Sequence, residues 1–200
     1  RLDHVMFAGF THAPAVELAT ALLAHAPPGL GRVFYADCGS AAVEVALKLS
    51  YQGRRQRGET GRARFATLHN SYHGETLGAL ALCGSGLYRD TFAPLLFDAL
   101  ELPAPNFPDH RPEQADGDLG ADTPEAEAAI ALLERHAGEL TAVVIEPLVQ
   151  CAGRMAMTGT GYYRRIAAAA RARGIDVIAD EIAVGFGRTG RLFASSWAGV

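Results

Sequence analysis

The chain has 200 residues, of which 49% are hydrophobic and 20% charged, and its formal net charge is −4. These values are ordinary for a soluble globular protein of one or two domains, and they offer neither the basic surface of a nucleic-acid-binding protein nor an apolar run long enough to span a bilayer. Three scattered cysteines and the absence of a signal-peptide layout at Arg1–His4 lead us to expect a cytoplasmic protein without disulfides.

Short apolar runs alternate along the chain with alanine-rich stretches of helical period. In chain order, we predict a helix at 13–26, a strand at 32–36, a helix at 40–52, strands at 64–68 and 97–102, a surface loop at 103–124, a helix at 125–136, a strand at 142–145, a helix at 162–173 and a strand at 175–179. This alternation predicts an α/β fold, with a mostly parallel sheet sandwiched by helices. We expect residues 1–30 to form a lead-in segment with its helix and residues 31–200 to form the α/β domain.

Three motifs follow predicted strands, and ligands of open α/β sheets bind beyond the carboxyl ends of the strands. The first motif is "ADCGSAAVEVALKL", in which Gly39 and Ser40 open a helix. Glycine lets the backbone approach a ligand, and the helix amides and dipole favour an anion such as phosphate. Taken alone, the motif is better explained as a capped helix without a ligand, with the Ser40 hydroxyl as the cap. It matches neither a dinucleotide-binding loop nor a P-loop.

The second motif is "HNSYHGETLGAL", which follows the strand at 64–68. Tyr72 can offer its ring face to a flat ligand, and His73 can form a hydrogen bond or titrate. The alternative is a turn that contains a partly buried histidine and caps a helix. His69 and His73 are four residues apart, but the intervening turn argues against a helical metal pair, so we expect no metal site.

The third motif is "VIADEIAVGFGRTG", in which an apolar strand ends in Asp180 and Glu181. A carboxylate at the end of a buried strand is costly unless it is paired, and a cationic partner stabilises it. The partner of Asp180 can be an arginine such as Arg188 or a protonated heteroaromatic nitrogen. For Glu181, we expect hydrogen bonds to solvent or to the following loop.

A phosphate site, an aromatic face and a strand-end aspartate together suit a flat, phosphorylated cofactor that contains nitrogen. Pyridoxal 5'-phosphate fits all three, because an aspartate keeps its pyridine nitrogen protonated and the ring can then accept electrons.

Four segments, "IADEIAVGFGRTG", "VVIEPLVQ", "NSYHGETLGAL" and "DCGSAAVEVALK", resemble the class III (ornithine-type) aminotransferases of PLP fold type I, and the resemblance covers essentially the whole chain. It implies that residues 31–200 are part of a PLP-binding large domain and that the protein is a homodimer. It further implies that Gly39 and Ser40 bind the cofactor phosphate, that Tyr72 stacks on the ring and lines the substrate site, that Asp180 pairs with the pyridine nitrogen, and that Glu146 lies near the substrate.

The chain departs from the family pattern at Cys38, where a small residue such as serine is common, at Arg154, where glycine is frequent, and at Ala183, which is glutamine in many relatives. The family also requires a Schiff-base lysine. The only lysine is Lys48, for which we expect a helical ion pair with Glu44. We therefore expect the chain to be a piece of a longer enzyme.

The segments "LDHVMFAGFTHAPAVELA" and "EPLVQCAGRMAM" are most similar to the branch of the family that acts in biotin synthesis. This implies S-adenosylmethionine as amino donor and 8-amino-7-oxononanoate as acceptor, giving 7,8-diaminononanoate. The alternatives are a class III aminotransferase for ornithine, 4-aminobutyrate or a diamine, and a fragment that binds PLP without catalysis.

Overall fold

The computed structural model describes residues 6–84, 87–109 and 117–200 of the chain. These residues form two compact units, 1–35 and 36–200, and each is considered by itself. The loop predicted at 103–124 is irregular where it is described, and residues 110–116 of that prediction lie outside the described residues. Among the described helices, none joins the length to the apolar character that crossing a bilayer requires.

The first unit contains α1, Ala13–Leu23, which confirms the helix predicted at 13–26. His12 caps this helix, because its Nδ1 accepts a hydrogen bond from the Ala15 amide at 3.3 Å. The strand predicted at 32–36 is wrong, since none of the described strands includes these residues. The apolar pattern there serves side-chain packing instead: the Tyr35 hydroxyl donates to the Ala15 carbonyl at 2.5 Å, and its ring lies 5.6 Å from that of Phe7.

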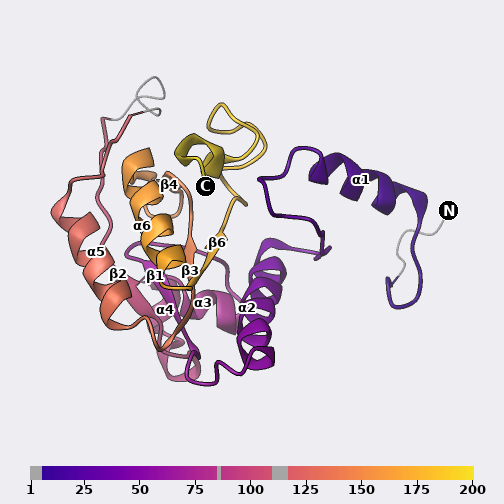
Figure 1. Cartoon of the computed structure of the whole chain (residues 1–200), viewed down its shortest axis with the longest axis horizontal. Coiled ribbons are helices and arrows are strands. Elements are labelled where there is room, and N and C mark those ends of the chain that lie inside the picture. The colour runs from indigo at the N-terminus through magenta and orange to yellow at the C-terminus, as the bar shows by residue number, and fades with distance from the viewer. Residues whose placement is uncertain (1–5, 85–86, 110–116) are drawn as a thin grey trace. The chain divides into compact units, whose positions relative to one another are not determined.

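The second unit is built on a four-stranded sheet in the order β2-β1-β3-β6, with every neighbouring pair parallel (Figure 1). The strands are β1 at Arg64–Leu68, β2 at Leu100–Leu102, β3 at Leu140–Ile145 and β6 at Asp176–Ala179. The predicted α/β class with a parallel sheet is confirmed. The strand predicted at 97–102 is shorter in the structure.

Helices cover both faces of this sheet (Figure 1). On one face lie α2, Gly39–Gln56, and α3, Leu77–Ala81; on the other lie α5, Pro124–Arg135, and α6, Thr160–Ala172. The other elements within the described residues are α4 at Leu87–Asp90, η1 at Ala93–Leu95, β4 at Val149–Gln150, β5 at Ala156–Met157 and η3 at Ala194–Ala198.

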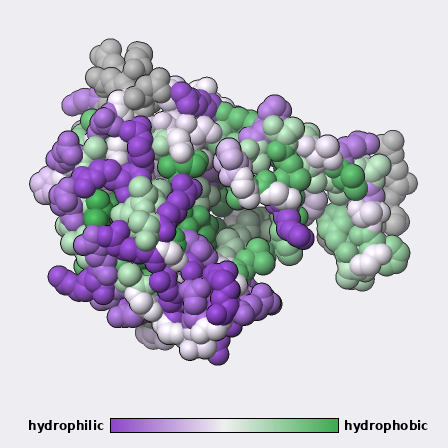
Figure 2. Space-filling view, viewed as in Figure 1, coloured by the Kyte–Doolittle hydropathy of each residue, from purple (hydrophilic) through white to green (hydrophobic). Residues whose placement is uncertain are grey.

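The central strand β3 explains why the sheet has two apolar faces. All six of its residues are buried, and successive side chains point to opposite sides. Ala142 and Val144 pack in the cluster that contains α2, whereas Val143 and Ile145 pack in the cluster that contains α5 and α6. Hydrophilic residues dominate the visible outer surface of the unit formed by 36–200 (Figure 2).

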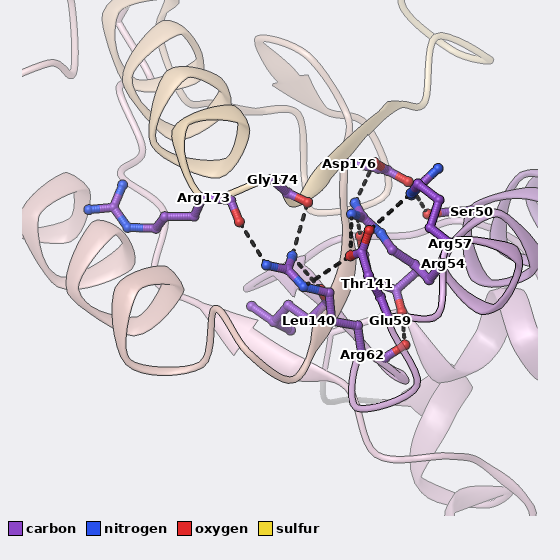
Figure 3. A network of polar contacts seen from close by, with 10 residues as sticks. All are labelled: Ser50, Arg54, Arg57, Glu59, Arg62, Leu140, Thr141, Arg173, Gly174 and Asp176. Carbon is purple, nitrogen blue, oxygen red and sulfur yellow. Dashed lines mark hydrogen bonds and ion pairs between the residues drawn. The ribbon is translucent and has the colours of Figure 1, made fainter.

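A buried arginine ties α2 to the amino ends of two strands (Figure 3). Arg54 is only 4% exposed; its guanidinium donates to the Thr141 carbonyl at 3.1 Å, to Asp176 at 2.5 Å and to Glu59 at 3.1 Å. Asp176 also accepts a hydrogen bond from the Ser50 hydroxyl at 2.6 Å. Because α2 is anchored here, its opposite end has a defined position beside the carboxyl ends of the strands.

Candidate active site

A cavity of about 390 Å³ lies where β1, β3 and β6 end and α2 begins. All five residues predicted for the site line it: Gly39, Ser40, Tyr72, Glu146 and Asp180. The other lining residues are Cys38, His73, Gly74, Cys151, Ala152, Ile182 and Ala183. The structure therefore brings together predicted site residues that are up to 141 positions apart, Gly39 and Asp180, as the carboxyl-end argument predicts.

The start of α2 is capped by a thiol. Cys38 occupies the N-cap position, and its Sγ accepts a hydrogen bond from the Ala41 amide at 3.4 Å. The alternative in which Ser40 caps the helix is therefore wrong. Instead the Ser40 hydroxyl accepts a hydrogen bond from the Glu75 amide at 3.2 Å, so this side chain joins the helix start to the turn that carries Tyr72.

The helix start and the turn approach each other closely at a glycine. Gly74 has φ of +122°, and a Cβ at this position would lie 2.1 Å from the Ser40 Oγ and 3.0 Å from the Ser40 Cα. Gly39 meets the opposite wall of the cavity, since a Cβ there would lie 3.0 Å from Cδ1 of Ile182. Close approach thus requires glycine at position 74, whereas the neighbour of Gly39 is the end of the flexible Ile182 side chain.

Tyr72 is half-buried in the cavity wall. Its hydroxyl donates to the Glu75 carboxylate at 3.1 Å, and its backbone amide donates to Oε2 of Glu146 at 3.1 Å. Hydrogen bonds therefore hold Tyr72 both to Glu75, three residues later in the same turn, and to Glu146 at the end of β3.

Asp180 is 7% exposed and its partner is His73, which is 2% exposed. Oδ2 of Asp180 lies 2.7 Å from Nδ1 of His73, and Oδ1 accepts a hydrogen bond from the Ile182 amide at 3.1 Å. The predicted alternative of an Asp180–Arg188 pair is wrong, because Arg188 is exposed and forms no ion pair with Asp180 in the described structure. The histidine was identified as able to form a hydrogen bond, but its partner follows a strand more than a hundred residues away.

Glu146 is a buried carboxylate, 5% exposed. Besides the Tyr72 amide it accepts the amide of Cys151 at 3.1 Å, so it links the ends of two loops. Burial raises the pKa of Glu146 above its ordinary value, and the hydrogen bond from Tyr72 and the charge interaction with His73 oppose this shift.

The Glu181 side chain does not share the partner of Asp180, His73, but bonds to the loop that follows it. Its two carboxylate oxygens accept the amides of Ala194 at 2.7 Å and Ser195 at 2.8 Å, at the start of η3. The prediction of loop hydrogen bonds for Glu181 is confirmed.

The three residues that depart from the family pattern lie either in an unusual backbone conformation or in the cavity wall. Arg154 has φ of +62°, a left-handed conformation that favours glycine. Ala183 lines the cavity, as does Cys38. The ion pair predicted between Glu44 and Lys48 is not formed in the described structure, where Glu44 accepts the Gly78 amide at 2.8 Å instead. All three cysteines are free, and the described residues contain no cluster of side chains suited to a metal ion.

These residues fit a phosphorylated heteroaromatic cofactor. The cavity volume falls in the range of small-molecule sites, about 300–1,000 Å³. The start of the 18-residue helix α2 presents backbone amides to an anion, Tyr72 supplies an aromatic ring, and Asp180 supplies a buried acid for a cationic nitrogen.

Comparison with known proteins points in the same direction. The family model for aminotransferase class III matches residues 1–200. The whole chain is 42% identical to adenosylmethionine-8-amino-7-oxononanoate aminotransferase of Geobacter sulfurreducens and spans 44% of that relative. The protein of the same name from Methanocaldococcus jannaschii is 32% identical over 96% of this chain, which spans 43% of it.

Two solved structures resemble the fold. The crystal structure of the Methanocaldococcus jannaschii protein has a TM-score of 0.85 and 33% identity, covering 96% of this chain and 41% of that chain. An amine transaminase from an uncultivated Pseudomonas species, solved in a PLP-bound form, has a TM-score of 0.82 and 31% identity, covering 98% and 44%. The expected fold type I class is therefore confirmed, and the chain spans less than half the length of these proteins.

Proposed function

Because this chain belongs to the class III aminotransferase family, we propose that the protein of which it is part transfers an amino group from a donor amine to a keto acid, with pyridoxal 5'-phosphate as cofactor. The observation that carries this proposal is the convergence of Ser40, Tyr72 and Asp180 on one cavity. In this proposal, residues 1–30 are a lead-in segment and residues 31–200 are part of the PLP-binding large domain.

When bound, pyridoxal phosphate supplies an aldehyde that receives the amino group and a ring that accepts electrons. The backbone amides of Gly39 and Ser40 would bind its phosphate at the start of α2. Tyr72 would lie against the ring and exclude water from one face. The Asp180 carboxylate would hold the positive charge on the ring nitrogen. Glu146 keeps the Tyr72 turn in register with the end of β3.

The cofactor chemistry also needs a lysine. Lys48 is exposed on α2 and is not among the residues that line the cavity. We propose that the lysine is supplied by a part of the protein beyond this sequence. The alternative of a fragment that binds PLP without catalysis applies to these 200 residues in isolation.

For the substrates, we propose S-adenosylmethionine as donor and 8-amino-7-oxononanoate as acceptor, giving 7,8-diaminononanoate in biotin synthesis. The support is the name shared by relatives that are 42% and 32% identical. The second candidate is another class III activity, on ornithine, 4-aminobutyrate or a diamine, and it is favoured by the likeness to an amine transaminase.

We further propose a cytoplasmic homodimer. The large apolar side chains that residues 6–35 leave exposed support an association surface; they include Met6 at 70%, Phe10 at 67% and Phe34 at 67%.

The test uses the full-length protein. We expect it to bind PLP with a change in visible absorbance, to lose that band with S-adenosylmethionine and to regain it with 8-amino-7-oxononanoate. Asp180→Asn keeps the shape of the site but removes the charge, and we expect it to bind PLP while turnover falls by orders of magnitude. Activity with ornithine or a diamine instead would select the second candidate, and absence of PLP binding would reject the proposal.

A further inference from the structure

Behind the His73–Asp180 pair lies a closed group of hydroxyls. Nε2 of His73 is 3.4 Å from Oγ1 of Thr67, on β1. Thr67 Oγ1 lies 2.7 Å from Ser71 Oγ, and each of these hydroxyls lies 2.7 Å from the carbonyl oxygen of Leu82, at the end of α3. Thr67, Ser71 and His73 are all at least 95% buried, so the protons in these contacts come from the protein itself.

Counting those protons determines the direction of the His73–Thr67 contact. The three oxygens make three short contacts, and a carbonyl cannot donate. The two hydroxyls hold one proton each, so at most two of the three contacts can be hydrogen bonds. If the Thr67 hydroxyl donated its hydrogen bond to Nε2, only the Ser71 proton would remain for the three 2.7 Å contacts among Thr67, Ser71 and the Leu82 carbonyl. Unprotonated oxygens at this distance repel each other, and buried polar groups without a partner are costly.

The arrangement that satisfies most groups has Nε2 as the donor and Thr67 as the acceptor. The Thr67 hydroxyl in turn donates its hydrogen bond to the Ser71 hydroxyl or to the Leu82 carbonyl. On the other side of the ring, Nδ1 faces the Asp180 carboxylate at 2.7 Å, where a carboxylate can only accept. In this arrangement both ring nitrogens carry a proton.

We propose that Thr67 is a positioning residue that holds His73 doubly protonated against Asp180, with Ser71 and Leu82 fixing the direction of the Thr67 proton. The imidazolium and the carboxylate form an ion pair whose side chains are 0% and 4% exposed. A buried ion pair of this kind needs its remaining protons satisfied, and Thr67 accepts the one on Nε2.

The consequence for the cofactor rests on the proposed function. In that function Asp180 would hold the protonated ring nitrogen on one side, while His73 contacts the same carboxylate from the other side at 2.7 Å. Thr67 thus acts on the reaction through two other side chains and touches neither cofactor nor substrate.

The test is a nitrogen-15 NMR spectrum of the histidine rings in the full-length protein near neutral pH, with no PLP added. The His73 resonances are identified by their loss in His73→Asn. Thr67→Ser keeps the hydroxyl, whereas Thr67→Val keeps the shape and removes it. We expect two protonated ring nitrogens in the wild type and in Thr67→Ser, and a shift of Nε2 to the unprotonated position in Thr67→Val.

A wild-type spectrum with one unprotonated nitrogen on His73 would overturn the proposal, whether or not Thr67→Val folds. Retention of the double protonation in a folded Thr67→Val variant would overturn the role of Thr67. A separate titration with PLP, followed by absorbance, reports on the proposed function. Failure of the wild type to bind PLP would reject that function and leave the result for His73 unchanged.

Discussion

Replacing Gly74 by alanine tests whether the turn and the start of α2 form one unit. The added Cβ would lie 2.1 Å from the Ser40 Oγ, 2.9 Å from its Cβ and 3.0 Å from its Cα, so Ser40 must move. The moved side chain would lose its hydrogen bond from the Glu75 amide. In addition, alanine would have to adopt φ of +122°, which side-chain-bearing residues rarely do.

The expected cost follows from these two effects. Strain at a sparsely populated backbone conformation costs about 1–3 kcal/mol, and a lost hydrogen bond about 0.5–1.5 kcal/mol. We therefore expect Gly74→Ala to lower the free energy of unfolding by about 2–4 kcal/mol. In a Ser40→Gly background the Oγ and Cβ contacts are absent, so the same substitution should cost about 1 kcal/mol less.

Urea unfolding of the full-length protein, followed by tryptophan fluorescence, measures all four members of this cycle. Gly138→Ala is the matched control, because a Cβ there meets nothing within 4 Å, and it should change stability by no more than about 0.5 kcal/mol. An equal cost of Gly74→Ala with and without the Ser40 side chain would refute the steric argument. A cost as small as that of the control would refute the whole account.

Three further variants, two of them with a matched control, test the described contacts. Arg154→Gly should raise the free energy of unfolding by about 0.5 kcal/mol because it relieves φ of +62°, whereas Arg55→Gly within α2 should lower it by about 1 kcal/mol; urea unfolding decides whether the signs differ. Arg54→Ala should cost about 2–4 kcal/mol in the same assay, since it removes a buried cation, and exposed Arg57→Ala about 0.5 kcal/mol or less. Burial raises the pKa of Glu146 above 4.5, so the folded state binds more protons than the unfolded state between 4.5 and the raised value. The free energy of unfolding of the wild type, relative to that of Glu146→Gln, should therefore rise as the pH falls from about 7 to about 5. If this difference fell instead over the same range, the assigned shift would be contradicted.

Elements in the buried part of the sheet were predictable because their residues have few alternatives. β3 is a largely apolar run whose six residues are all buried, which is how a strand covered on both faces reads, whereas β6 is shorter, begins with Asp176 and is only partly buried. The run at 32–36 looks similar in sequence but belongs to none of the described strands, and Tyr35 packs through its side chain instead. Composition alone cannot distinguish these two environments.

The candidate site divides in the same way. Groups at strand ends, such as Asp180, were predictable because the motif itself places them there. Their partners were not, because a partner depends on which strands are neighbours. Arg188 is close to Asp180 in sequence, yet His73 pairs with it because β1 and β6 both flank β3. Likewise Glu44 bonds to Gly78 on another helix instead of Lys48 on its own.

The adjacent acids at the end of β6 divide their contacts between two regions. Asp180 holds the amide of Ile182, while Glu181 holds the amides of Ala194 and Ser195. Ile182 and Ala183, two residues of the cavity wall, therefore directly follow two residues whose carboxylates are held by backbone amides. Deuterium uptake at Ala194 and Ser195 should consequently slow when a small molecule fills the cavity, which makes these distant amides a sensor of occupancy that requires no label.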